Sequence, residues 1–155
     1  MPNDALTHDG SIATLTLAQP LDADCVAALT QACEQVAQED ATRVLVLQAP
    51  AAWAGWTDGA WAQAEELGLI GDPFAAFARL PQPTIAVLQG PVRDAGLELA
   101  LCGDIRVAAA DATFALPGLG AGAMPIAGGL QRLARAVGRA RAHELALGGA
   151  TIDAE

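Results

Sequence analysis

The sequence predicts an α/β fold that forms one domain. Apolar segments of strand length alternate with amphipathic segments of helix length, which indicates βαβ units. Glycine and proline clusters separate these segments, and neither an internal repeat nor a linker interrupts them. A chain of 155 residues is long enough to bury a core without disulfides or metals. We therefore expect a single domain over residues 1–155.

The first part of the chain predicts two strands with a long helix between them. Residues 11–17 alternate between apolar and polar and are rich in β-branched side chains, so they predict a strand. Asp22 or Asp24 can cap a helix that continues to about Gln38. The segment Arg43–Gln48 is almost continuously apolar, which is typical of a strand covered on both faces.

The middle of the chain predicts short helices followed by a strand and a further helix. After a loop over Ala49–Asp58, helices are expected at Ala60–Leu69 and Phe74–Leu80. Prolines then lead into a strand at Thr84–Leu88. The next helix is expected over Ala95–Cys102, because a small-residue turn precedes its apolar run.

The last part of the chain predicts one strand, an irregular segment and two helices. Asp104–Ala109 reads as a strand, and Thr113–Leu116 as a short extended piece. Pro117–Gly129 is rich in glycine and is expected to be irregular. Helices are predicted at about Ala127–Val137 and at Arg139–Leu147, the second ending at a pair of glycines.

The charge balance bears on which partners the chain can bind. Acidic residues outnumber basic ones, the formal net charge is −10 and there is no lysine. Nucleic-acid binding requires a basic surface, so we do not expect it. No apolar run reaches the roughly 20 residues of a membrane span. The first ten residues do not resemble a signal peptide, so we expect a cytoplasmic protein that does not bind membranes.

The cysteines and histidines do not suggest a metal site. Cys25, Cys33 and Cys102 lack metal-ligand spacing and are expected to be reduced core residues. His8 is expected in a flexible N-terminal segment, and His143 on a late helix. Because the two histidines are isolated, we predict surface positions for both and no metal.

The segment from Pro83 to Asp104 carries the strongest chemical signal. A short strand meets a Gly-Pro turn, and a helix then begins at Asp94-Ala95-Gly96. The free backbone N–H groups at a helix N-terminus can hold an anion. Glu98 follows within the first turn among leucines, a position suited to acid/base chemistry.

The same segment resembles the crotonase, or enoyl-CoA hydratase/isomerase, superfamily, and the resemblance covers most of residues 83–155. The first part of the chain matches more loosely. The matching segments are Ile12–Leu17, Arg43–Leu47, Trp53–Trp56, Pro83–Asp104, Asp104–Ala108, Asp111–Phe114, Pro125–Leu133, Val137–Ala140 and Ile152–Glu155.

The resemblance implies a fold, an assembly and a substrate. The fold is a crotonase-like (ClpP/crotonase) spiral of ββα units. Family members continue beyond the position of Glu155, so the chain is expected to lack the usual C-terminal helical region. The apolar surface left exposed favours self-association, and the resemblance implies a homotrimer or hexamer. The implied substrate is a coenzyme A thioester, with no other cofactor, in fatty acid metabolism.

The resemblance also implies how the thioester is held. The backbone N–H groups of Trp56 and Ala95 form the oxyanion hole. Other residues at the family's substrate-binding positions are Trp53, Ala54, Gly55, Gly96, Pro117, Gly118 and Ile126.

The acid/base residues match the family pattern only in part. Glu98 matches the first of the two glutamates found in the hydratases. The second glutamate position is Gly118, and a position where some relatives place an aspartate is Ile126. Three hypotheses follow: hydration of a 2-enoyl-CoA with Glu98 as the sole acid/base, a catalytically silent scaffold, or a decarboxylase that needs only the oxyanion hole. Glu98 has a structural alternative, in which it bonds a backbone group, Arg93 or Arg106 and organises the core.

Three further features each allow two interpretations. Asp94 stands where the family usually has a glycine, and it either caps its own helix, or points away or takes part in catalysis. Trp53, Trp56 and Trp61 form either a pocket wall, which we favour, or a core plug. Half of the eight arginines lie between residues 132 and 141, where they either contact coenzyme A phosphates or an acidic neighbour, or form a solvated face.

Overall fold

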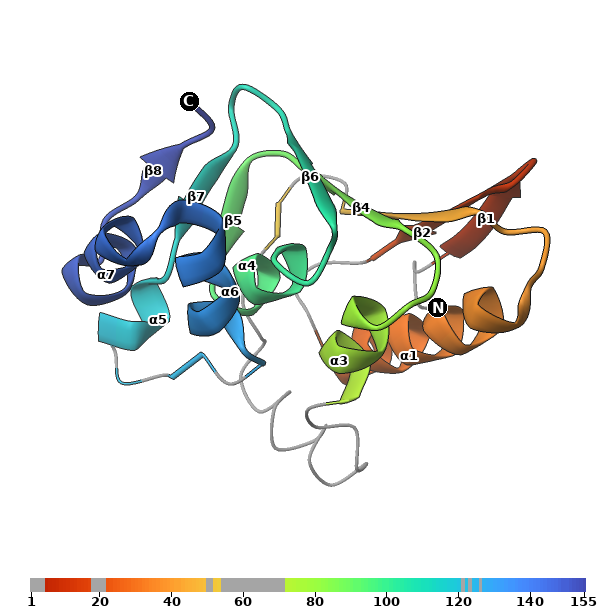
Figure 1. The fold of residues 1–155 in the computed structure, drawn as a ribbon. Helices are drawn as coiled ribbons and strands as arrows, with labels where there is room; N and C mark the ends of the chain where they lie inside the picture. Colours follow the sequence, from red (N-terminus) through yellow and green to blue (C-terminus); the bar gives the residue numbers. More distant parts are fainter. Residues whose placement is uncertain are drawn as a thin grey trace.

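The computed structural model describes residues 5–17, 22–49, 52–53, 72–120, 122, 124–125 and 127–155. Within them, two β-sheets lie along one side of the molecule and the helices along the other (Figure 1). The predicted α/β class and the repeated ββα pattern are confirmed. In chain order the elements are β1 (Ala5–Asp9), β2 (Ile12–Thr16), α1 (Ala23–Gln38), β3 (Val44–Gln48), α3 (Asp72–Ala78), β4 (Thr84–Leu88), β5 (Pro91–Arg93), α4 (Ala95–Ala100), β6 (Ile105–Ala108), β7 (Thr113–Ala115), α5 (Pro117–Gly120), α6 (Gly129–Val137), α7 (Arg139–Gly148) and β8 (Ile152–Asp153).

The larger sheet has five strands in the order β1-β2-β3-β4-β6. The hairpin of β1 and β2 is antiparallel, and the other pairs are parallel. Ile12 lies opposite Val44, and Ile85 lies opposite Ile105. Each parallel pair requires a long crossover connection, which is where α1, α3 and α4 lie.

The smaller sheet has three strands in the order β5-β7-β8. Trp53 extends it by one parallel bridge to Val92 on the free side of β5. The Trp53 N–H donates to the Pro91 carbonyl at 2.8 Å, and the Arg93 N–H donates to the Trp53 carbonyl at 2.7 Å. This sheet therefore fixes the backbone immediately before α4.

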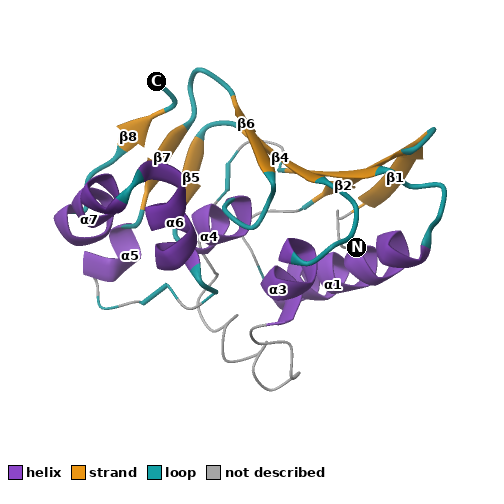
Figure 2. Cartoon of the chain, viewed as in Figure 1, coloured by secondary structure: helices purple, strands orange, loops and turns teal. Residues whose placement is uncertain are grey.

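The core lies between the sheets and the helices, which are on one side of the larger sheet (Figure 2). Burial alternates along β3, so that Leu45 and Leu47 are fully buried while their neighbours are half-buried. The expectation that this strand is covered on both faces is therefore wrong. Its apolar run is continuous, but the helices of the described ranges pack on only one face.

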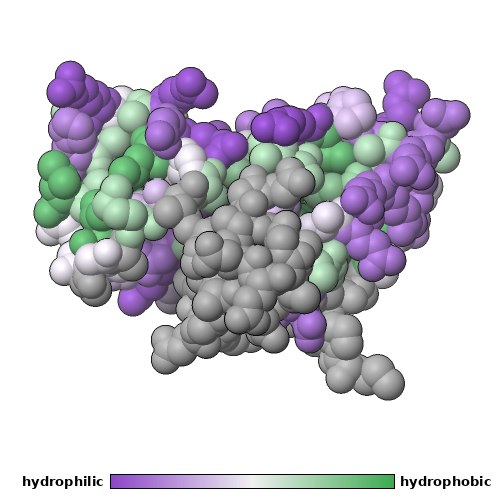
Figure 3. Space-filling model, turned by 90° about the horizontal axis from the view of Figure 1, so that it is seen from below, coloured by the Kyte–Doolittle hydropathy of each residue, from purple (hydrophilic) through white to green (hydrophobic). Residues whose placement is uncertain are grey.

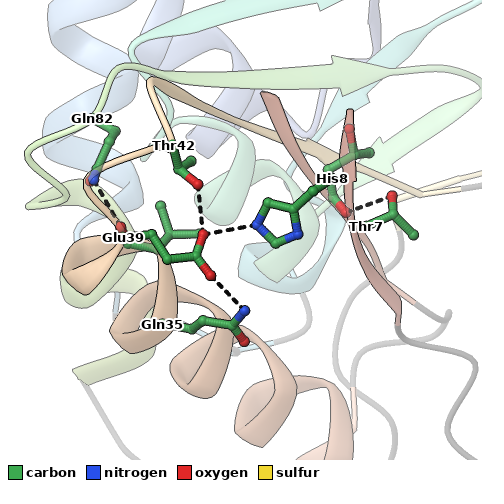
Figure 4. Close-up of polar contacts among 8 residues, drawn as sticks. Thr7, His8, Gln35, Glu39, Thr42 and Gln82 are labelled. Carbon is green, nitrogen blue, oxygen red and sulfur yellow. Dashed lines mark hydrogen bonds and ion pairs between the residues drawn. The ribbon is translucent and has the colours of Figure 1, made fainter. Parts of the chain in front are cut away.

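The ends of α1 are fixed by side-chain hydrogen bonds. Asp22 is the N-cap, as predicted, and its Oδ1 accepts from the Cys25 N–H at 2.9 Å. At the other end, Gln82 Nε2 donates to the Val36 carbonyl at 2.8 Å (Figure 4). That bond ties α1 to the segment that enters β4.

Glu39, which follows α1, accepts hydrogen bonds from three side chains (Figure 4). They are the Thr42 hydroxyl at 2.6 Å, the Gln35 amide at 2.7 Å and the His8 ring at 2.9 Å. These bonds, that of Thr42 first, lower the pKa of the Glu39 carboxyl from 4.5 to about 2. His8 lies on β1 and not in a flexible segment, because the β1–β2 hairpin orders this part of the chain.

The surface divides into a hydrophilic part and an apolar part. In the view of Figure 3, hydrophilic side chains gather over α1, and apolar ones gather at the end formed by α5 to α7. The large apolar side chains that are exposed include Val137 and Leu147 on these helices, and Ile105 and Val107 on β6. Exposed apolar surface was expected, and this arrangement places part of it on an outer strand of the larger sheet.

Candidate active site

The turn between β5 and α4 has an unusual backbone. Asp94 has φ 45° and ψ −120°, and it is the one residue other than glycine with positive φ in the described ranges. Residues with a Cβ rarely adopt this conformation, and glycine adopts it easily. The Asp94 N–H donates to the Ala115 carbonyl of β7 at 3.2 Å, which holds the turn in place. The strand arrangement therefore imposes a glycine-like conformation on an aspartate.

The Asp94 carboxylate does not cap α4. Its Oδ1 accepts instead from the Gly118 N–H at 2.9 Å, at the start of α5. The interpretation that Asp94 occupies the amides of its own helix is therefore wrong, because the backbone turn directs the side chain toward α5. The bond joins two positions for which separate roles were predicted.

The first amides of α4 lie in a buried setting. Ala95 is 2% exposed, and every residue of α4 is buried. No described residue accepts a hydrogen bond from the Ala95 N–H. A helix N-terminus has N–H groups without intrahelical partners, so this amide can donate to a ligand atom.

Glu98 is buried one turn into the same helix, with 3% of its surface exposed. Its Oε2 accepts from the Ala127 N–H at 2.9 Å and from the Gly129 N–H at 3.0 Å, both at the start of α6. Both donors are backbone groups, which is one of the structural alternatives considered for Glu98. Arg106 donates to the Gly103 carbonyl at 2.7 Å.

Two further side chains contact the backbone of Glu98 and of its partner Ala127. Arg132 Nη1 donates to the Ala127 carbonyl, so the residue that donates to Glu98 is itself fixed from α6. Cys102 Sγ lies 3.3 Å from the Glu98 carbonyl, one turn further along the chain. Burial raises the pKa of the Cys102 thiol to about 11, with Arg132 opposing the shift and Glu98 adding to it.

Trp53 belongs to the core. Its side chain is 1% exposed, and its indole N–H donates to the Val87 carbonyl of β4 at 3.2 Å. Of the two roles left open for the tryptophans, these contacts favour the core plug for Trp53. The other predicted site residues of this loop, Ala54, Gly55, Trp56 and Trp61, lie outside the described residues.

Of the remaining predicted positions, one lies on α4 and two lie at the start of α5. Gly96 is buried on α4, Pro117 is exposed and Gly118 is half-buried. Ile126 lies outside the described residues. Ala127 and Gly129 were not predicted as partners of Glu98. The paired glycines Gly128 and Gly129 were the available signal, because a close backbone approach requires glycine.

The described residues place a hydrogen-bond donor and a carboxylate on the same short helix. The Ala95 amide can stabilise negative charge on an oxygen, and Glu98 can transfer a proton nearby. Among the described ranges, no three His, Cys, Asp or Glu side chains are grouped so that they could hold a metal ion. In those ranges no helix combines the length and the hydropathy needed to cross a membrane.

A sequence profile of the enoyl-CoA hydratase/isomerase family matches residues 7–155. The chain belongs to this family. The match includes the turn before α4, Glu98 and the start of α6. It confirms the resemblance on which the expected fold rests.

Curated members of the enoyl-CoA hydratase/isomerase family match over part of their length. The mevalonyl-coenzyme A hydratase of Beauveria bassiana is 43% identical over 102 residues, which are 66% of this chain and 34% of that protein. The 2,3-dehydroadipyl-CoA hydratase of Escherichia coli is 43% identical over 82 residues, or 53% of this chain and 32% of that protein. These matches span about a third of each relative.

Solved structures of family members share the fold over nearly the whole chain. An enoyl-CoA hydratase from Bacillus anthracis has a TM-score of 0.88 at 28% identity, covering 98% of this chain and 65% of that one. An enoyl-CoA hydratase from Polaromonas sp. JS666 has a TM-score of 0.85 at 28% identity, covering 97% and 65%. The crotonase fold is therefore present, and the chain spans less than two thirds of these structures.

Proposed function

We propose that this chain binds an acyl-CoA thioester and hydrates a 2-enoyl-CoA. The observation that carries the proposal is the buried Glu98 carboxylate, one turn from the Ala95 amide at the start of α4. The amide can donate a hydrogen bond to the oxygen of a thioester carbonyl, and the carboxylate can transfer a proton to the carbon next to that carbonyl. Membership of the enoyl-CoA hydratase/isomerase family supports the same chemistry.

The proposed reaction begins with polarisation of the thioester carbonyl. The Ala95 and Trp56 amides donate to its oxygen, and each donor contributes about 3 kcal/mol when negative charge develops there. Water then adds its oxygen to the β-carbon, the C=C π electrons move toward the carbonyl, and an enolate forms. The enolate collapses when a proton reaches the α-carbon.

Glu98 serves both proton transfers in this proposal. It first takes a proton from the attacking water and then delivers one to the α-carbon, so that H and OH are both accounted for. The amides of Ala127 and Gly129 hold one carboxylate oxygen and so orient the side chain. Trp53 was predicted to bind substrate but lies in the core, so the proposed substrate-binding residues are Ala54, Gly55, Gly96, Pro117, Gly118 and Ile126.

Turnover of crotonyl-CoA tests the proposal. The wild-type chain is expected to hydrate it, and Glu98→Gln to reduce kcat at least 100-fold, as loss of a general acid/base group does. Glu144→Gln is the matched control, because Glu144 is exposed and pairs with Arg141 on α7. Acetyl-CoA binding by calorimetry should be similar in all three proteins. A wild-type chain that binds acetyl-CoA but leaves crotonyl-CoA unchanged would refute hydration.

A second candidate is a scaffold or oligomerisation domain without catalysis. It is favoured by the two backbone hydrogen bonds to Glu98 Oε2, which give the carboxylate a structural task. Absence of acetyl-CoA binding at millimolar concentration would support this candidate. A decarboxylase is distinguished by malonyl-CoA turnover that survives Glu98→Gln. Assembly as a homotrimer or hexamer stays a prediction for sedimentation experiments.

A further inference from the structure

The end of α4 opposite Ala95 borders a cavity. A cavity of about 530 Å³ opens between α3 and α6, and the residues from the end of α4 to the start of β6 form its floor. Four of its lining residues are arginines, namely Arg79, Arg106, Arg132 and Arg135. They make up half of the eight arginines in a chain whose net charge is −10.

The arginines reach the cavity from separate elements. Arg132 and Arg135 lie three residues apart on α6, so they share one helix face. Arg79 follows the last residue of α3, and Arg106 lies on β6. Positive φ at Gly138 separates α6 from α7, which removes the remaining members of the arginine-rich segment, Arg139 and Arg141, from this face. The cavity is therefore built by the fold and not by one basic stretch of sequence.

The positive charge in the cavity is poorly balanced. Asp104 is the one carboxylate among the lining residues, and its Oδ2 accepts from the N–H and the hydroxyl of Thr84, both at 2.8 Å. The ion pairs seen among the described residues, His8 with Glu39 and Arg141 with Glu144, involve none of these four arginines. Arg106 and Arg132 each use one donor on a backbone carbonyl, and Arg79 and Arg135 are exposed.

We propose that this cavity binds a small phosphorylated molecule that carries at least two negative charges. Guanidinium groups bind phosphate oxygens through paired hydrogen bonds, and each group retains several donors. A phosphoryl group presents three oxygens in different directions, which matches arginines converging from three elements. A bound anion also relieves the repulsion between neighbouring guanidinium groups.

This inference does not depend on the proposed hydration. Glu98 bonds the backbone at the start of α6, whereas the cavity is lined by residues 101–104, which follow the other end of α4. Loss of enoyl-CoA turnover would therefore leave the cavity unchanged. Conversely, a loss of phosphate binding would not affect the assignment of Glu98.

Calorimetric titration with inorganic pyrophosphate at low ionic strength tests the proposal. The double variant Arg79→Gln/Arg135→Gln is expected to weaken binding at least tenfold. Both side chains are exposed and make no hydrogen bond with a described residue, so the fold should persist. The matched control is Arg43→Gln/Arg139→Gln, which removes the same charge from exposed positions outside the cavity. It should change the affinity less than threefold.

A charge-conserving variant separates a built site from general attraction. Arg79→Lys/Arg135→Lys keeps the charge but removes the planar guanidinium groups, which bind phosphate through two parallel N–H groups. This variant should therefore bind pyrophosphate more weakly than the wild-type chain does. If the glutamine variant fails to fold, this lysine variant carries the test. Equal weakening in the cavity variant and the Arg43/Arg139 control would overturn the proposal, as would a lack of saturable binding at millimolar pyrophosphate.

Two other outcomes would assign the cavity to different ligands. Tighter binding of citrate than of pyrophosphate would indicate a polycarboxylate and overturn the phosphoryl assignment. A change in sedimentation of the Arg79/Arg135 variant, with unchanged pyrophosphate affinity, would identify a protein interface instead. Retained pyrophosphate binding in the control, with loss in the cavity variant, is the expected result.

Discussion

The Glu98 side chain occupies the space that a Cβ on Gly129 would need. An ideal Cβ at residue 129 would lie 2.4 Å from Glu98 Cγ and 2.8 Å from its Oε2. The Gly129 N–H donates to that same Oε2 at 3.0 Å. The start of α6 therefore approaches α4 closely enough for a backbone amide to reach a buried carboxylate, and only glycine permits the approach.

Gly129→Ala is expected to destabilise the protein by about 1–3 kcal/mol, the usual cost of inserting a methyl group into a packed site. Glu98 cannot move aside without breaking its two hydrogen bonds. Urea denaturation measures the change. Gly148→Ala is the control, because Gly148 lies in α7 with open space where its Cβ would be. There the free energy of unfolding should stay equal or rise by up to about 1 kcal/mol. Equal effects at both positions would contradict the close approach.

Substitutions of Asp94 should separate backbone strain from hydrogen bonding. Asp94→Ala keeps a Cβ at φ 45° and loses the bond to the Gly118 N–H, so we expect a loss of about 1–3 kcal/mol. Asp94→Gly loses the same bond but removes the strain, and it should unfold at a higher urea concentration than Asp94→Ala. Asp94→Asn retains an acceptor and should be the mildest change. Identical midpoints for the glycine and alanine variants would show that the turn is unstrained.

Stability below neutral pH should depend on Glu39. Its pKa of about 2 in the folded chain lies below the ordinary 4.5, so the folded state favours the ionised form. The resulting stabilisation is complete above about pH 4.5 and is lost as the pH falls toward 2. Glu39→Gln should reduce the decline of the urea midpoint between pH 4.5 and 2. Glu34→Gln, at an exposed position of α1, is the control and should keep the wild-type slope.

The thiols should react slowly in the folded protein. All three cysteines are buried, and burial raises the pKa of Cys33 to about 12 and that of Cys102 to about 11. Thiolate is the reactive form, so labelling by a disulfide reagent at pH 8 should be at least about 100-fold slower than in urea. In urea, the unfolded chain should react with three equivalents of the reagent, one for each cysteine. Rapid labelling of the native protein would show that the core around α1 and α4 opens easily.

Much of the fold follows from local sequence pattern. The β-rich and apolar segments predicted β2, β3, β4 and β6, and the Asp22 cap predicted where α1 begins. The three-residue strand β5 and the two-residue β8 were not predicted, because strands this short exist only through pairing with distant residues. The expectation that His8 lies in a flexible segment was wrong for a related reason, since β1 is ordered by its pairing with β2 and by the hydrogen bond between His8 and Glu39.

The candidate site was less predictable than the fold. The prediction that Ala95 and Glu98 lie on one helix is confirmed, because two residues three positions apart in a helical segment are placed by the local sequence alone. The partners of Glu98 lie 29 and 31 residues further along the chain, and no local pattern specifies such contacts. The direction of the Asp94 side chain likewise depends on a turn held by β7. The four cavity arginines come from three separated parts of the sequence and share no motif.

The parallel pairing of the larger sheet has a kinetic consequence. Ile12 meets Val44, Leu45 meets Thr84, and Ile85 meets Ile105, so each pairing closes a long stretch of chain. The chain loses conformational entropy when it closes each loop, before the hydrogen bonds between the strands form, and this slows folding. Refolding of this chain should thus proceed on the timescale of β-rich domains, despite its many helices.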